Sequence, residues 1–99
     1  MPTEPELQVI RDKADAIIEA ITAMPPKDRT TLISKTFGEN YNLLLELAKK
    51  ADPTVAQSGP PSGRPDTRGY WLEKYVDIHA YTLEIAKRFP EEPPMGTMG

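Results

Sequence analysis

The chain has 99 residues, 11 of them proline and none cysteine, and its formal net charge is −3. A chain of this length forms one domain with a small core. Without cysteine it has no disulfides, no thiolate metal ligands and no cysteine nucleophile. No apolar run reaches the roughly 18 residues of a membrane span, and the acidic N-terminus does not resemble a signal peptide. We therefore expect a cytoplasmic protein without a membrane segment.

The first predicted helix spans residues 4–23. Thr3 is a suitable N-cap with Glu6 three residues later, and Pro5 falls in the first turn, where a missing N–H costs nothing. A Pro-Pro pair ends the helix, because the residue before proline avoids the helical region. Between these signals, apolar residues recur every three or four positions, as in an amphipathic helix: Leu7, Ile10, Ala14, Ile17, Ile21 and Met24.

The second predicted helix spans residues 27–51, and Asp52-Pro53 ends it. Its one irregularity is Gly38, which costs about 1 kcal/mol relative to alanine inside a helix. Either one continuous helix uses Gly38 where another segment packs close, or a short helix ends there and a second begins near Glu39. We favour the continuous helix.

Residues 52–66 are rich in proline and glycine and are predicted to be an irregular linker. The third predicted helix spans residues 67–89, with Asp66 as its N-cap. Residues 1–90 would then form a single all-α domain, a helical hairpin joined through the linker to a third helix. The tail 91–99 is predicted to be disordered. The linker is long enough for the third helix to pack on its own hairpin or on that of a second copy.

The sequence offers little for catalysis. The carboxylates fall on predicted solvent faces, and the single histidine, His79, lies on an apolar stripe between Val76 and Leu83, where a core role is the commoner one. Metal-ligand spacings are absent. We therefore expect no enzyme activity, no cofactor and no metal. A small-molecule pocket at His79 and the aromatic residues of the third helix is one alternative.

Residues 31–49 superficially resemble a helix-turn-helix, with Gly38 as the turn glycine. The residue after that glycine is normally apolar and here is Glu39. The negative net charge gives no electrostatic footprint for nucleic acid, so we regard such a partner as unlikely. A DNA-binding regulator stays open as an alternative, and its contact residues would be Tyr41, Asn42 and Lys49.

The apolar surface exceeds what a three-helix chain can bury. Three consecutive leucines, 43–45, spread over more of the second helix than one core-facing stripe covers. The third helix carries two adjacent apolar stripes and outward-facing tyrosines. We therefore expect a self-associating interaction module, a homodimeric adaptor or accessory subunit that also contacts another protein. Asn40 is expected to fix the dimer register, and the candidate partner-binding residues are Leu43, Leu45, Arg68, Tyr70, Trp71 and Tyr81.

Overall fold

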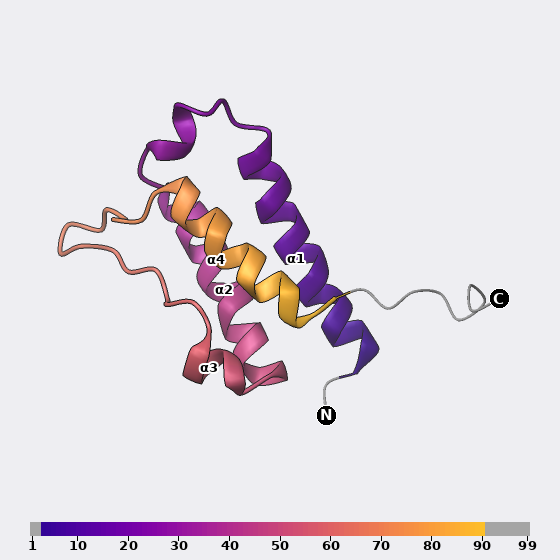
Figure 1. Cartoon of the computed structure of the whole chain (residues 1–99). Coiled ribbons are helices and arrows are strands. Elements are labelled where there is room, and N and C mark those ends of the chain that lie inside the picture. Colours follow the sequence, from indigo (N-terminus) through magenta and orange to yellow (C-terminus); the bar gives the residue numbers. More distant parts are fainter. Residues whose placement is uncertain (1–2, 91–99) are drawn as a thin grey trace.

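The computed structural model of the protein describes residues 3–90 (Figure 1). Its elements are α1 (Glu4–Thr22), the single 3-10 turn η1 (Asp28–Thr30), α2 (Lys35–Ala51), the short α3 (Thr54–Ser58) and α4 (Tyr75–Arg88). Over this range there is no strand, only two isolated antiparallel bridges. The all-α prediction is confirmed. The prediction for the tail 91–99 lies outside the described residues.

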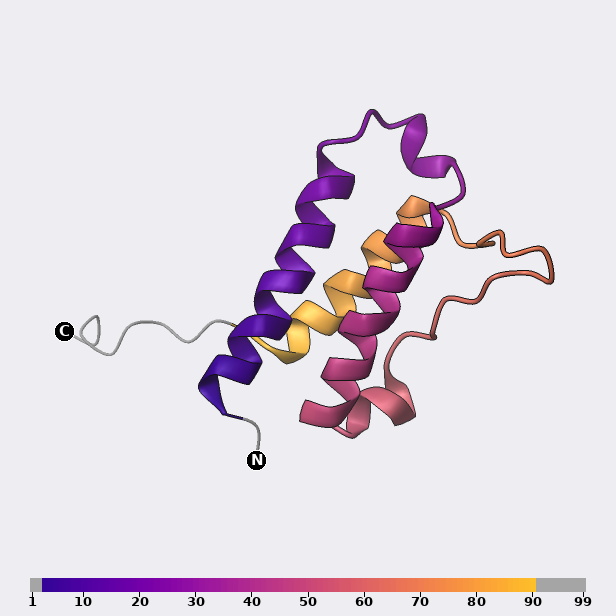
Figure 2. The same cartoon turned by 180° about the vertical axis from the view of Figure 1, so that it is seen from behind.

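The core lies where α1, α2 and α4 meet. In two opposite views α4 crosses one side of the hairpin formed by α1 and α2 (Figures 1 and 2). It packs chiefly on α1 and to a smaller extent on α2. The third helix that the sequence predicts is therefore α4, and it completes the core of its own chain. The buried apolar side chains of the three helices are Ile10, Ala14, Ile17, Ile21, Tyr41, Leu44, Leu45, Ala48, Ile78 and Ile85.

The first helix forms where the sequence predicts it. The Thr3 hydroxyl accepts a hydrogen bond from the Glu6 backbone N–H at 3.4 Å, so the predicted N-cap is present. Its far end is capped by Arg29, whose guanidinium donates to the carbonyl oxygens of Thr22 and Met24 at 2.8 and 3.1 Å. These contacts satisfy carbonyls that have no partner within a helix end.

The second helix begins eight residues later than predicted, at Lys35 rather than at residue 27. The hydroxyls of Thr30 and Thr31 donate back to carbonyls of the preceding turn and compete with helix formation there. The Ser34 hydroxyl then accepts from the Phe37 backbone N–H at 3.2 Å, which makes Ser34 the N-cap. About two turns of the predicted helix, residues 27–34, are replaced by η1 and an extended segment.

The helix does run through Gly38, so the continuous-helix interpretation is confirmed. The reason is the close approach of the Trp71 indole, since a Cβ placed on Gly38 would lie 2.5 Å from that ring. A Cβ on Gly63 would lie 2.9 Å from the same ring. The indole is thus held between α2 and the long connection that follows α3.

The predicted linker is more ordered than expected. Residues 54–58 form α3, and Val55 is buried against the core. The Asp52 carboxylate accepts hydrogen bonds from the backbone N–H and the hydroxyl of Thr54, at 3.0 and 2.7 Å. An aspartate followed by proline therefore does not simply end α2, because it also starts the next helical turn.

The predicted third helix corresponds to α4, which begins at Tyr75 rather than at residue 67, so Asp66 is not its N-cap. The Asp66 carboxylate instead accepts from the backbone N–H groups of Arg68 and Tyr70, at 2.8 and 3.0 Å, and closes a turn. Gly69 has a φ of 89°, which a helix does not allow. The residues of this turn therefore project as a loop tip.

Extended pairing carries the chain from that loop into α4. The Ile33 backbone N–H donates to the Glu73 carbonyl at 2.9 Å, and the Tyr75 N–H donates to the Thr31 carbonyl at 3.2 Å. This pairing of two segments of the same chain uses backbone groups that a longer helix would have satisfied internally. At the N-terminus of α4, the Asp77 carboxylate accepts from the Lys74 backbone N–H.

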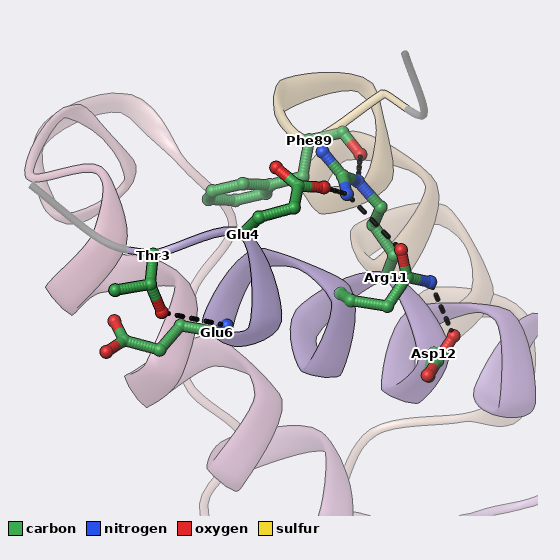
Figure 3. A network of polar contacts seen from close by, with 7 residues as sticks. Thr3, Glu4, Glu6, Arg11, Asp12 and Phe89 are labelled. Atoms are coloured by element: carbon green, nitrogen blue, oxygen red, sulfur yellow. Dashed lines mark hydrogen bonds and ion pairs between the residues drawn. The ribbon is translucent and has the colours of Figure 1, made fainter. Parts of the chain in front are cut away.

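The two ends of the described segment, residues 3–90, meet at Arg11, which is buried (Figure 3). Its Nε donates to the Phe89 carbonyl at 3.2 Å, and its Nη1 pairs with the Glu4 carboxylate at 2.6 Å. One guanidinium thus ties the last residue of the α4 segment to the start of α1.

We predict that Gly38→Ala lowers the free energy of unfolding by about 1–3 kcal/mol, the usual cost of overpacking. The reason is the indole beside Gly38, because alanine otherwise favours a helix. Thermal unfolding followed by circular dichroism measures the effect. In a double-mutant cycle with Trp71→Leu, the cost of the alanine should shrink. An equal cost in both backgrounds would contradict this account.

Candidate functional site

Three of the six candidate partner-binding residues are engaged within the chain. Leu45 lies in the core, and Trp71 is buried between α2 and the long connection. Tyr81 is half-buried, with its ring 6.1 Å from that of Tyr41. A partner could not contact Leu45 or Trp71 without unpacking the core. The expectation failed for Trp71 because it assumed a helix through residue 71.

The other three candidates are exposed. Leu43 lies on α2, while Arg68 and Tyr70 lie at the tip of the loop between α3 and α4. The Arg68 guanidinium pairs with Asp66 at 3.1 Å and stacks over the Tyr70 ring, 5.4 Å from its centroid. The tip is therefore a structured projection with an arginine and a tyrosine side by side. Asn40 is exposed on α2 and lies outside the core.

Two of the three residues named for DNA contact, Tyr41 and Asn42, form hydrogen bonds within the fold instead. The Tyr41 hydroxyl donates to the Pro61 carbonyl at 2.7 Å. The Asn42 amide donates to the Gly63 carbonyl and accepts from the Gly63 N–H, both at 2.9 Å. Burial, followed by the nearby Tyr81 and Glu73, raises the pKa of the Tyr41 phenol. Both side chains hold the long connection on α2.

The helix-turn-helix interpretation of residues 31–49 is wrong. Residues 31–34 precede the helix, and Gly38 lies inside α2 rather than in a turn. Lys49 is half-buried in the last turn of the same helix. A reading helix with a supporting helix before it is therefore not formed by this segment.

One face of α4 carries apolar side chains that contact water. Val76 and Leu83 are 46% and 39% exposed, and they lie two turns apart on the same side of the helix. His79, half-buried, and Ala80, exposed, lie between them. We call these four residues the α4 face. The core-facing side of the helix is fully used by Ile78, Thr82 and Ile85.

Two further exposed leucines lie just before the first turn of α4. Leu32 and Lys74 are directly opposite in the antiparallel pairing, so their side chains project on the same side. Leu72 precedes Lys74 by two residues in the chain. Both leucines are at least half exposed. The sequence did signal this surface, as the second apolar stripe of the third helix, but the predicted partner residues were placed elsewhere.

Two cavities of the described residues lie at the end of α4 away from its first turn. They are about 160 and 350 Å³ in volume and share Arg11, Phe89 and Pro90 in their walls. Neither is lined by His79 or Trp71, the residues of the expected small-molecule site. Within residues 3–90, no three histidine or acidic side chains are grouped as a metal site would need. In the same range no helix combines the length and apolar character that crossing a membrane demands.

Comparisons with protein families, with curated proteins and with solved structures gave no match. The site must therefore be judged on its own chemistry. That chemistry is apolar contact at the α4 face and arginine–tyrosine contact at the loop tip.

We predict that Asn42→Ala loosens the long connection, because two hydrogen bonds to one buried glycine are lost together. The free energy of unfolding should fall by about 1–3 kcal/mol, and the Gly63 amide should exchange faster with solvent. Asn40→Ala, on the exposed side of the same helix, is the matched control and should change neither quantity. Equal effects of the two substitutions would show that the hydrogen bonds between Asn42 and Gly63 do not hold the connection in place.

We predict that the loop tip opens in acid. Hydrogen bonds from the backbone N–H of Tyr70 first, and then from Arg68, lower the pKa of Asp66. A carboxyl whose folded pKa lies below its unfolded value stabilises the fold at neutral pH and loses that effect as the pH falls through the folded pKa. The protection of the Tyr70 amide against exchange, taken relative to an unstructured amide at the same pH, should therefore fall below about pH 4.

Asp66→Asn is the control for this titration. The amide oxygen still accepts hydrogen bonds but does not titrate in this range. The protection of the Tyr70 amide should then no longer fall in acid. An unchanged acid dependence in this variant would show that another group opens the tip.

Proposed function

We propose that the chain is a non-catalytic interaction module of the cytoplasm, that it associates with itself, and that the α4 face is its contact surface. The observation that carries this proposal is the position of Val76 and Leu83, both exposed on a helix whose other side is already buried. Complete burial of such side chains is worth about 1.5–3 kcal/mol each. Side chains left about half exposed retain part of this gain for a partner.

Continuity separates this surface from other exposed apolar residues. Val9 and Leu43 are 46% and 44% exposed, but they lie on α1 and α2, respectively. Single exposed apolar residues are common on protein surfaces and need no explanation. The α4 face instead combines two such residues on one helix and is preceded in the chain by exposed Leu72.

The loop tip supports contact with another protein. Arginine and tyrosine are enriched among the residues that dominate binding energy, and Arg68 and Tyr70 are already held together there. Their ordered arrangement lowers the entropy lost on binding. We propose the tip as the second contact region of an adaptor or accessory subunit.

The test is the solution mass of matched double variants, measured by light scattering on a sizing column at low and high salt. We predict that the native chain is a dimer at both salt concentrations, because apolar contact is not screened by ions. Val76→Glu with Leu83→Glu should give a monomer with an unchanged helical circular dichroism spectrum.

Val9→Glu with Leu43→Glu is the control, because it places the same charges at equally exposed valine and leucine positions. This pair should remain dimeric. A native monomer at every concentration would refute self-association. A dimer lost only in the control pair would move the contact surface to α1 and α2.

A further inference from the structure

The buried guanidinium of Arg11 keeps two N–H donors that the described chain does not use. Its Nε donates to the Phe89 carbonyl, and its Nη1 donates to the Glu4 carboxylate at 2.6 Å and to the Gln8 side-chain oxygen at 3.4 Å (Figure 3). Nη2 carries two further N–H groups and donates no hydrogen bond within residues 3–90. Burying a cation is costly unless its donors find acceptors. These two donors are therefore available to a ligand.

Arg11 also lines a cavity with the size and the walls of a small-molecule site. The larger of the two cavities beside it has a volume of about 350 Å³, within the roughly 300–1,000 Å³ of ligand pockets. Its apolar wall residues are Leu7, Ala51, Phe89 and Pro90. Ligand pockets combine such walls with a few polar groups that fix the orientation of the ligand. The walls therefore favour a ligand with a hydrocarbon part.

The same cavity has an unused acceptor in its wall, on Asp52. The Oδ1 atom of Asp52 accepts from the backbone N–H and the hydroxyl of Thr54, whereas Oδ2 accepts no hydrogen bond from the described part of the chain. The bond from the Thr54 hydroxyl, and then the one from its backbone N–H, lower the pKa of Asp52, so this carboxylate is charged at neutral pH. Arg88, the remaining charged wall residue, already donates to the Thr54 hydroxyl at 3.1 Å and to the Ser58 carbonyl at 3.3 Å.

The charges around the cavity balance. Arg11 and Arg88 are positive, while Asp52 in the wall and Glu4, which pairs with Arg11, are negative. A ligand with only a negative charge would meet the like charge of Asp52, and one with only a positive charge would meet that of Arg11. A zwitterion matches both groups, because its carboxylate suits a guanidinium and its ammonium group suits a carboxylate.

We propose that this cavity binds a free α-amino acid with an apolar side chain. The carboxylate of the amino acid accepts from Arg11 Nη2, its ammonium group donates to Asp52 Oδ2, and its side chain packs on Leu7 and Phe89. The walls come from α1 and from the ends of α2 and α4, so the bound amino acid stabilises the folded chain. The cavity does not include the α4 face or the loop tip, and the proposal does not rest on self-association.

Isothermal titration calorimetry with L-leucine and two analogues tests the proposal. Isocaproate is leucine without its ammonium group, and isoamylamine is leucine without its carboxylate. Leucine should bind at one site per chain and raise the Tm. It should bind at least about tenfold more tightly than either analogue, because each analogue loses a charge-assisted hydrogen bond.

Two results would overturn the proposal. One is the absence of both binding and a Tm shift with leucine and with phenylalanine at millimolar concentrations. The other is equal affinity for leucine and isocaproate, which would mean that the ammonium group has no partner in the site.

Asp52→Asn tests the contact with the ammonium group. The amide oxygen can still accept from Thr54, while an NH2 group takes the place of Oδ2, so the helical circular dichroism spectrum should be unchanged. Leucine should bind at least about tenfold more weakly, and isocaproate should bind no more weakly than to the native chain. Asp15→Asn is the matched control, because Asp15 lines only the smaller of the two cavities. An equal loss of leucine binding in both variants would refute the proposed contact.

Discussion

The path of the chain between α2 and α4 depends on where one indole ring packs. Trp71 lies against two glycines, Gly38 on α2 and Gly63 on the long connection, and it is almost fully buried. The ring needs both glycines, because a Cβ at either position would overlap it. With the indole in place, residue 71 cannot belong to a helix that begins at Asp66. The late start of α4 and the projecting loop tip accompany this packing, together with the turn closed by Asp66 and the positive φ of Gly69.

The cost of that packing is visible at two polar atoms. The Trp71 Nε1 and the Glu73 Oε2 are buried without a hydrogen-bond partner among the described residues. A buried polar group without a partner destabilises a fold by about 1–3 kcal/mol. The other Glu73 oxygen accepts from the Arg64 backbone N–H at 3.0 Å, so this carboxylate helps to hold the connection. The segment is fastened by several contacts that must outweigh the two unsatisfied atoms.

The sequence predicted those features of the helices that depend on apolar periodicity and on local residues that start or stop a helix. The bounds of α1 and the passage of α2 through Gly38 follow from spacing and from the small size of glycine. The start of α4 could not be found in this way, because Asp66 is equally suited to cap a helix or a turn. Gly69 three residues later was the local signal for the turn. Long-range pairing between Ile33 and Glu73 left no trace in local sequence.

The sequence predicted an exposed apolar surface, but it did not predict which residues form that surface. An apolar excess is countable from composition and spacing, and the structure leaves such an excess on α4. Which leucine is buried depends on the direction from which the other helices approach. Leu45 faces the core and Leu43 faces water, although they are separated by a single residue.

The hydrogen bonds between Asn42 and Gly63 also affect which positions of the sequence can change without loss of the fold. Asn42 bonds the backbone of that residue, not a side chain, and the bridge between Pro65 and Trp71 closes the base of the tip. The side chains of Arg68 and Tyr70 take no part in either of these two contacts with the rest of the chain, whereas Asp66 and Gly69 shape the turn itself. Loop tips with this property accept substitution and insertion readily. Binding specificity could thus diverge at Arg68 and Tyr70 while the helical scaffold stayed the same, and foreign peptide epitopes could be grafted there.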